Sequence, residues 1–176
     1  MALISGLLFE VITSNLSGAG TDGDIYLGIG GREFHVDSTK DDYERGSWRD
    51  YILGELPFDP PGDPFPEQVR VNNPQFNDPR AGFQLDTEDL GHAPVYVRFE
   101  PEGDDDNWNI GFAAALVYTN QFFSAYLTPQ RFDNLWLGHR SGKVLYLTFE
   151  FRMEAKTYAE ARRILSSKAG RKLARP

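Results

Sequence analysis

A glycine-rich turn that carries two aspartates follows the first apolar run of the chain. Residues 17–24 read SGAGTDGD. Glycine-rich turns beside strands often hold phosphate, because their backbone N–H groups approach an anion closely. The carboxylates of Asp22 and Asp24 would repel such a ligand. The turn therefore favours a cation, to which a tight backbone can also offer carbonyl oxygens.

Two further acidic segments extend this pattern, DDYERG at residues 41–46 and DDD at residues 104–106. A hard divalent cation such as calcium takes six to eight oxygen ligands from carboxylates and carbonyls. If the three loops share one end of the fold, they can supply such a set. The candidate ligands are Gly20, Thr21, Asp41, Asp42 and Asp105. The alternative is that these acids only solvate their turns and cap nearby N–H groups.

Aromatic side chains near these loops are candidates for contact with a lipid or a protein partner. Trp48 follows the second acidic segment, where an exposed indole would lie at a lipid interface. Phe58 and Phe65 lie among prolines further along. They either form a patch that binds a partner or pack as a local cap.

The motifs of common enzyme sites are missing from the sequence. There is no cysteine, which excludes a thiol nucleophile and thiolate zinc sites. No HExxH or GxSxG motif occurs. The segment GHRSGKV at residues 138–144 has too short a glycine spacing for a phosphate loop. We therefore expect a protein that is not an enzyme.

The charge of the chain is uneven. The sequence has 18 basic and 26 acidic residues, and eight of the basic ones but only two acids lie from Arg152 onward. The first 151 residues thus carry a net charge of −14. Such a body repels nucleic acid, and it repels anionic membranes unless cations intervene. The basic C-terminal segment either docks on this body or meets an anionic partner.

Hydrophobic periodicity favours a β-rich fold with many turns. Expected strands include 7–13, 25–29, 33–36, 48–53, 95–100, 110–119 and 122–127, followed by an alternating run over 143–152. Residues 54–94 are rich in Pro, Asp and Asn and form a long insertion with short extended pieces such as 69–71. A capping box at Thr157 and Glu160 predicts a short C-terminal α-helix.

We predict an all-β protein, an antiparallel β-sandwich of two sheets over residues 1–152, with the basic helix and tail at 153–176. No run approaches the roughly 20 apolar residues that span a bilayer. The apolar run at 3–12 has no basic leader, and we interpret it as a strand rather than a signal peptide. We expect a soluble protein, cytoplasmic or peripheral to a membrane.

The first third of the chain resembles the PLAT family (polycystin, lipoxygenase, alpha-toxin), also called the lipoxygenase-homology domain. The resemblance rests on a strand ending in Ile12-Thr13, the loop GAGTDGD, the strand IYLGI and the segment DDYERGSWRDYIL. Val95–Glu100, the acidic turn, Trp108 and the segment NLWL at 134–137 are similar to later parts of the family pattern. The insertion and Gly18, where some calcium-binding members have aspartate, depart from it.

The resemblance implies a two-sheet sandwich with calcium sites on edge loops, used to bring a protein to a membrane, a lipid or another protein. We therefore expect a recognition module that binds a lipid surface or a protein partner, with calcium as a possible cofactor. Two alternatives remain. One is a carbohydrate-binding β-sandwich that stacks sugars on Trp48 and loop aromatics. The other is an accessory domain of a lipase or lipoxygenase-type enzyme.

Overall fold

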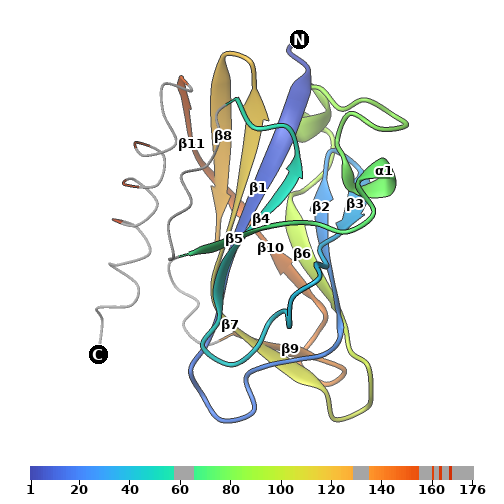
Figure 1. The fold of residues 1–176 in the computed structure, drawn as a ribbon, viewed down its shortest axis with the longest axis vertical. Helices are drawn as coiled ribbons and strands as arrows, with labels where there is room; N and C mark the ends of the chain where they lie inside the picture. Colours follow the sequence, from blue (N-terminus) through green and yellow to red (C-terminus); the bar gives the residue numbers. More distant parts are fainter. Residues whose placement is uncertain (58–65, 129–134, 155–159, 161–162, 164–166, 168–176) are drawn as a thin grey trace.

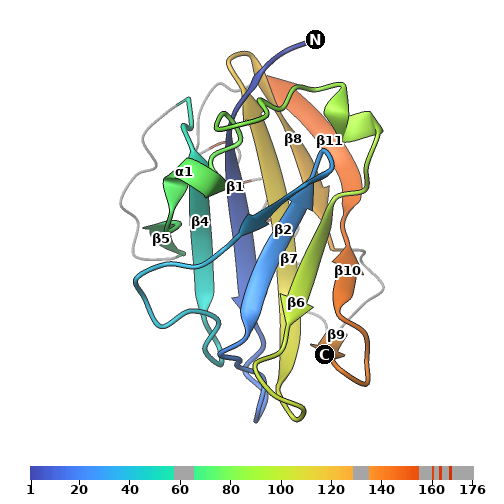
Figure 2. The ribbon, with the colours of Figure 1, turned by 90° about the vertical axis from the view of Figure 1, so that its right-hand side faces the viewer.

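Two β-sheets packed face to face make up the described part of the protein (Figures 1 and 2). The computed structural model describes residues 1–57, 66–128 and 135–154, together with Glu160, Arg163 and Ser167. The larger sheet has seven strands in the order β11-β8-β7-β1-β4-β5, with β9 pairing to β7. The smaller sheet has four strands in the order β10-β6-β2-β3. The predicted all-β sandwich of two sheets is thereby confirmed.

The strand bounds follow the predicted runs closely. The larger sheet is built from β1 (Ile4–Thr13), β4 (Trp48–Gly54), β5 (Glu67–Arg70), β7 (Asn107–Thr119), β8 (Phe122–Leu127), β9 (Leu135–Gly138) and β11 (Thr148–Glu154). The smaller sheet is built from β2 (Asp24–Ile29), β3 (Arg32–His35), β6 (Tyr96–Glu100) and β10 (Val144–Tyr146). All strand pairs are antiparallel except β4 with β5, which run parallel.

The space between the sheets holds the main hydrophobic core. Alternate residues of β1, namely Leu7, Phe9 and Val11, point into it and meet Ile25 and Leu27 of β2 from the facing sheet. Trp108 of β7 is fully buried there and donates its indole N–H to Thr13 Oγ1 at 3.0 Å. Trp108 therefore belongs to the core, whereas Trp136 of β9 is only half-buried.

A second apolar layer covers the opposite face of the larger sheet. Because successive side chains of a strand point to opposite faces, the other residues of β1, β4, β7 and β8 gather there. We call the following residues the outer cluster: Leu8, Ile12, Ile52, Phe112, Ala114, Leu116, Tyr118, Phe123, Ala125 and Leu127. Each is buried, the most exposed being Ile12 at 8%. The larger sheet is thus buried on both of its faces.

The alternating run at residues 143–152 is not one strand. Its first part forms β10 at the edge of the smaller sheet, and its second part forms β11 at the edge of the larger one. The chain crosses between the sheets at Leu147, whose N–H bonds to the carbonyl of Val95 at 2.9 Å. Leu145 and Leu147 therefore face the core, whereas Phe149 is 52% exposed.

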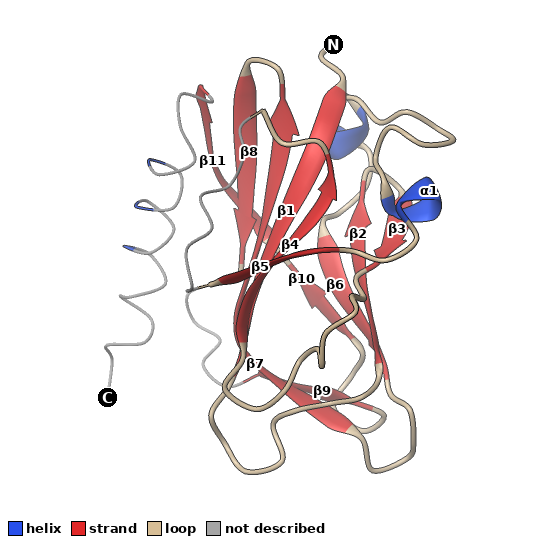
Figure 3. Cartoon of the chain, in the orientation of Figure 1, coloured by secondary structure: helices blue, strands red, loops and turns tan. Residues whose placement is uncertain are grey.

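In the described residues of the predicted insertion, the chain forms one strand and two helical turns, α1 (Pro74–Asn77) and η1 (Asp89–Gly91) (Figure 3). Its strand β5 (Glu67–Arg70) overlaps the extended piece expected at 69–71, beginning two residues earlier and ending one residue earlier. Phe58 and Phe65 lie outside the described residues, as does most of the predicted C-terminal helix, of which Glu160, Arg163 and Ser167 are described and helical. Within the described ranges, no helix has the length and apolar character needed to cross a membrane.

Candidate functional site

Three loops meet at one end of the sandwich, the lower end in Figure 1. They are the β1–β2 loop (residues 14–23), the β3–β4 loop (36–47) and the β6–β7 loop (101–106). Backbone hydrogen bonds tie the first loop to its neighbours. Gly46 N–H donates to Ser14 O at 3.2 Å, and Asn109 N–H donates to Ala19 O at 3.0 Å. The segments that the sequence marks as acidic are therefore neighbours in space.

Three carboxylates converge across the first two of these loops. Asp22 comes from the β1–β2 loop, and Asp41 and Glu44 come from the β3–β4 loop. One carboxylate oxygen of each lies within 4.8 Å of the others, and all three residues are exposed. We call these three residues the carboxylate cluster. Oxygen atoms from carboxylates in this arrangement suit a hard divalent cation, which takes its remaining ligands from carbonyls and water.

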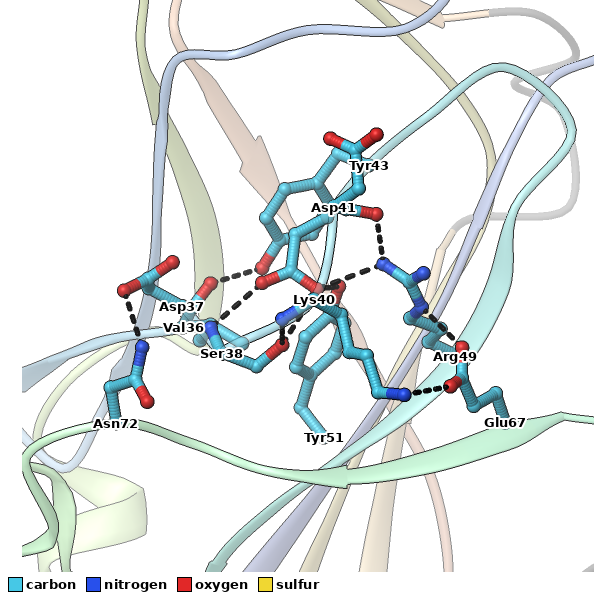
Figure 4. A network of polar contacts seen from close by, with 11 residues as sticks. Val36, Asp37, Ser38, Lys40, Asp41, Tyr43, Arg49, Tyr51, Glu67 and Asn72 are labelled. Carbon is cyan, nitrogen blue, oxygen red and sulfur yellow. Dashed lines mark hydrogen bonds and ion pairs between the residues drawn. The ribbon is translucent and has the colours of Figure 1, made fainter.

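Asp42, next to the cluster, is enclosed by hydrogen-bond donors from Ser38, Arg49 and Tyr51, all three of which are labelled in Figure 4. Its carboxylate accepts from Ser38 N–H at 2.7 Å and from Ser38 Oγ at 2.9 Å. It also accepts from the Arg49 guanidinium and the Tyr51 hydroxyl, each at 2.9 Å. Only 7% of the Asp42 side chain is exposed. This carboxylate therefore anchors the β3–β4 loop onto β4.

Arg49 extends the anchor in two directions. Its guanidinium donates to the backbone carbonyl of Asp41 and, at 2.9 Å, to the carboxylate of Glu67 on β5. The hydrogen bond from Arg49 holds the pKa of Glu67 below its usual value, helped by Lys40 at 3.2 Å. The strand from the insertion is thus linked through one arginine to the loop that carries Asp41.

Tyr43 fixes the turn between Asp41 and Glu44. Its backbone has a positive φ of 60°, a conformation that bulky residues rarely adopt. The ring is buried against Tyr51 and Trp108, with ring centroids 5.4 and 5.3 Å away, and the hydroxyl donates to the carbonyl of Val36. Burial raises the pKa of Tyr43 well above its usual value, so the hydroxyl stays a donor. This turn directs Asp41 and Glu44 outward while Tyr43 points into the core.

The β1–β2 loop is held by its threonine. The Thr21 hydroxyl donates to the carboxylate of Asp106, with both oxygens at 2.8 Å, and accepts from Gly23 N–H at 2.9 Å. Gly20 allows the close approach of the neighbouring loop, since a Cβ there would lie 2.9 Å from the backbone nitrogen of Arg45. The glycine-rich turn thus contacts both the β3–β4 loop and the β6–β7 loop and holds the three loops together.

Two hollows flank Asp22 at this end of the protein. The larger, of about 560 Å³, is open and lies among the three loops, with Arg45 as its basic wall residue. The smaller, of about 130 Å³, lies between β2 and the β3–β4 loop. Thr21 and Asp22 line both. A cation held by Asp22 would therefore border a hollow large enough for a polar group of a ligand.

The predicted ligand residues are distributed unevenly over this site. Gly20 and Thr21 lie in the glycine-rich turn where the three loops meet, and Asp41 lies in the carboxylate cluster. Asp42 lies beside the cluster with its oxygens already accepting four hydrogen bonds. Asp105 is exposed on the β6–β7 loop outside the cluster, and it is the adjacent Asp106 that contacts Thr21.

Two members of the cluster, Asp22 and Glu44, are not among the ligands predicted from the sequence. Asp22 belongs to the glycine-rich turn, and Glu44 belongs to the acidic segment at 41–46. The signal for Glu44 is its spacing, because a turn between positions i and i+3 brings both side chains to one side.

Trp48 begins β4 directly after the β3–β4 loop but is half-buried. Its indole N–H donates to Glu10 Oε1 at 2.6 Å, and its ring packs against the outer cluster. Among the described residues of the three loops, Leu16 of the β1–β2 loop is the large apolar side chain that is exposed, at 42%. Phe58 and Phe65 remain predictions, since they lie outside the described residues.

Comparison with known proteins supports the fold. No protein-family model and no curated protein sequence matches the chain. Among solved structures, alpha toxin from Clostridium absonum matches at 18% identity with a TM-score of 0.50, covering 84% of this chain and 32% of the toxin. A coral 8R-lipoxygenase, described as activated by calcium through a C2-like domain, matches at 17% identity with a TM-score of 0.48. That match covers 82% of this chain and 17% of the lipoxygenase.

The chain thus spans about a third of the toxin and about a sixth of the coral lipoxygenase. At this level of identity the likeness concerns the fold alone. The alpha toxin contains a PLAT domain. This is the family that the segments GAGTDGD and DDYERGSWRDYIL of the present chain resemble. The described chain has the two-sheet sandwich fold found in PLAT domains.

Proposed function

We propose that this protein is a non-enzymatic recognition module that binds calcium between its β1–β2 and β3–β4 loops and, through the calcium, an anionic lipid surface. The observation that carries the proposal is the convergence of Asp22, Asp41 and Glu44. Three exposed carboxylates this close repel one another, and a divalent cation removes that repulsion. The ligand atoms are all oxygens, which suits calcium.

Calcium is preferred to magnesium at such a site for a geometric reason. Magnesium requires a nearly ideal octahedron of short bonds and gives up its water reluctantly. Carboxylates on two exposed loops form a wide and adaptable set, which suits the longer bonds and variable coordination of calcium. Thr21 and Gly20 hold the first loop in place, and Asp42 and Arg49 hold the second.

The lipid part of the proposal follows from charge. The body of the protein is strongly acidic, so an anionic membrane repels it at a distance of the order of the Debye length. A calcium ion at the cluster offsets most of the negative charge of its three carboxylates and has coordination positions left for a phosphate or carboxylate of a lipid headgroup. The hollow beside Asp22, with Arg45 in its wall, can accept that headgroup, and Leu16 supplies an apolar side chain on the same loop.

Vesicle sedimentation tests this function. The full chain is mixed with vesicles of phosphatidylserine or of phosphatidylcholine, in calcium, in magnesium or in chelator. We expect the protein to pellet only with phosphatidylserine in calcium. Asp41→Asn should abolish pelleting, and the matched control Asp104→Asn, an exposed acid on the β6–β7 loop, should retain it. A wild-type chain that stays in the supernatant under every condition rules out lipid, and a protein partner then becomes the leading hypothesis.

A further inference from the structure

The outer face of the smaller sheet carries a polar and aromatic surface. Ile25, Leu27 and Ile29 of β2 point into the core, so the residues that alternate with them point outward. Figure 2 looks onto this face, and no described helix or strand lies over it, which leaves it open to a ligand. The cross-strand register arranges the outward residues in two rows, the first with Glu33, Gly28, Tyr96 and Tyr146 and the second with His35, Tyr26, Arg98 and Val144.

The Tyr96 ring lies flat on strand β2 because residue 28 is a glycine. A Cβ at Gly28 would lie 2.2, 2.3 and 2.6 Å from three atoms of this ring. One face of the ring therefore rests on the backbone of β2, and the other face points away from the sheet. Tyr146 is 60% exposed and stands beside Tyr96, with the ring centroids 6.2 Å apart and the ring planes at 68°. We call this pair the aromatic corner, in which Tyr96 is the floor and Tyr146 is the wall.

The charged side chains beside the aromatic corner hold one another in place. Arg98 donates to both carboxylate oxygens of Glu33, at 2.8 and 2.9 Å, and to Glu100 at 3.0 Å. Its guanidinium carbon lies 4.0 Å from the centroid of the Tyr26 ring. The Tyr96 hydroxyl donates to Glu33 at 3.0 Å. Because these groups are already ordered, a ligand that contacts them costs little side-chain entropy.

Hydrogen-bonding capacity remains at the aromatic corner. Within the described part of the chain, the contacts of Arg98 use three of the five N–H groups of its guanidinium. Glu33 Oε2 accepts one bond there, and a carboxylate oxygen has room for a second. The corner therefore offers donors and an acceptor at fixed positions.

The charges on this face cancel one another. Arg98 is paired with both Glu33 and Glu100. Lys143 lies 2.7 Å from Glu100 as well. These two acids and two bases leave no net charge, although the first 151 residues carry a net charge of −14. A charged ligand therefore gains no net attraction here, and the rest of the body repels nucleic acid and anionic lipid.

A sugar ring matches what the aromatic corner offers. One face of a pyranose is lined with C–H groups, which pack on an aromatic ring and meet its negative face. Its hydroxyl groups donate to carboxylates and accept from guanidinium groups. An apolar peptide would offer nothing to Glu33 and Arg98. The geometry of the rings and the two kinds of hydrogen-bonding group thus favour an uncharged carbohydrate.

We propose that the aromatic corner binds a neutral oligosaccharide. One sugar ring packs on Tyr96 and against Tyr146, and its hydroxyl groups bond to Glu33 and Arg98. The corner lies at Gly28, four residues along β2 from the end of the β1–β2 loop, a distance of about 13 Å. Sugar binding at this place requires no calcium and no contact with the three loops, so it stands or falls separately from the proposed function.

NMR titration of the full chain in chelator tests the site. The probes are neutral hexasaccharides of α-linked glucose, of β-linked glucose, of β-linked mannose and of N-acetylglucosamine. We expect at least one of them to shift the backbone amides of Gly28, Tyr96 and Tyr146 saturably, while the amides of Asp22 and Asp41 stay unchanged. If no probe shifts the first three amides at millimolar concentration, or if the shifts lie on other strands, the proposal is overturned. A protein interface would then be the better explanation of this face.

Substitutions at the wall test the stacking contact. Tyr146→Ala should weaken the affinity for the binding hexasaccharide about tenfold, because it removes an aromatic contact. Tyr146→Phe keeps the ring and should bind nearly as the wild type does. The matched control Phe83→Ala removes an aromatic ring that is 70% exposed in the insertion, and it should leave binding unchanged.

Wild-type affinity in Tyr146→Ala, or equal losses in Tyr146→Ala and Tyr146→Phe, would contradict the role of the wall. If Tyr146→Ala does not fold, the amide shifts of the unchanged chain still decide whether the sugar binds at the aromatic corner.

Discussion

The guanidinium of Arg49 lies 2.9 Å from the carboxylate of Asp42, and only 13% and 7% of these two side chains are exposed. The same guanidinium bonds to the carbonyl of Asp41, whose own carboxylate points to solvent. Two adjacent aspartates thus have opposite tasks. Asp42 holds the β3–β4 loop to the sheet, and Asp41 presents its charge outside. This division of tasks leads to separate predictions for stability and for calcium.

Asp42→Asn should destabilise the protein without any ligand present. It removes one partner of a largely buried ion pair, which typically costs about 3 kcal/mol. Asp41→Asn should change the free energy of unfolding little, because its side chain is exposed. Urea unfolding of the calcium-free variants measures both values. The anchor role of Asp42 is wrong if the two variants unfold at the same urea concentration.

The hydroxyl of Thr21 should contribute to stability through Asp106. Thr21→Val keeps the shape of the side chain but removes the donor to the carboxylate, and we expect a loss of about 1–2 kcal/mol. Thr21→Ser, which retains a hydroxyl, should lose less. Thermal unfolding of the two variants provides the comparison. A valine variant as stable as the wild type, with the serine variant destabilised, would show that the methyl packing of Thr21, rather than its hydrogen bond, matters.

Acid should weaken the fold partly through Glu33. Its carboxylate accepts two hydrogen bonds from Arg98, at 2.8 and 2.9 Å, and these bonds lower its pKa below the usual 4.5. A carboxyl whose pKa is lower in the folded state stabilises the protein above its unfolded pKa. That contribution is lost as the pH falls through the lower, folded pKa.

Unfolding free energies between pH 6 and pH 3 should therefore fall less steeply in Glu33→Gln than in the wild type. Glu88→Gln, at an exposed glutamate, is the control and should keep the wild-type slope. A Glu33→Gln protein with the wild-type slope would show that the ion pair with Arg98 contributes nothing to acid stability.

Leu16, rather than Trp48, should be the apolar contact with a vesicle. Leu16→Ser should reduce calcium-dependent pelleting with phosphatidylserine vesicles while leaving the unfolding temperature unchanged, because this side chain is exposed. Trp48→Phe should instead destabilise the fold by about 1–2 kcal/mol through the lost hydrogen bond to Glu10. If a stably folded Trp48→Phe variant lost vesicle binding while Leu16→Ser bound normally, Trp48 and not Leu16 would be the lipid contact, as the sequence predicts.

The sheets were accessible from the sequence because their strands follow clear patterns. Tyr26 and Gly28 alternate with the apolar residues of β2, and β8 matches its predicted bounds. The crossover at Leu147 was not accessible, because the alternation of side chains continues unbroken while the strand changes sheets. The apolar run of β1, interrupted by Glu10, is typical of a strand buried on both faces, and the structure shows this burial.

The site was predictable as a set of loops but not as a set of side chains. The sequence places Asp41 and Asp42 side by side and gives no means to tell them apart. Their directions depend on the left-handed conformation of Tyr43 and on donors from Ser38 and Tyr51. These contacts form within the folded loop and between the loop and β4. They cannot be predicted from the composition of the segment or from the spacing of its residues.

Calorimetric titration of calcium into the full chain is the most direct test of the proposed metal site. We predict saturable binding of calcium by the wild type, no comparable binding of magnesium, and loss of calcium binding in Asp22→Asn and Asp41→Asn. Asp104→Asn should bind as the wild type does. Calcium should also raise the unfolding temperature of the wild type, since a ligand present at about 100 times its Kd stabilises the native state by about 2.7 kcal/mol. A wild-type chain that gives no heat and no shift in unfolding temperature at several millimolar calcium would contradict the account.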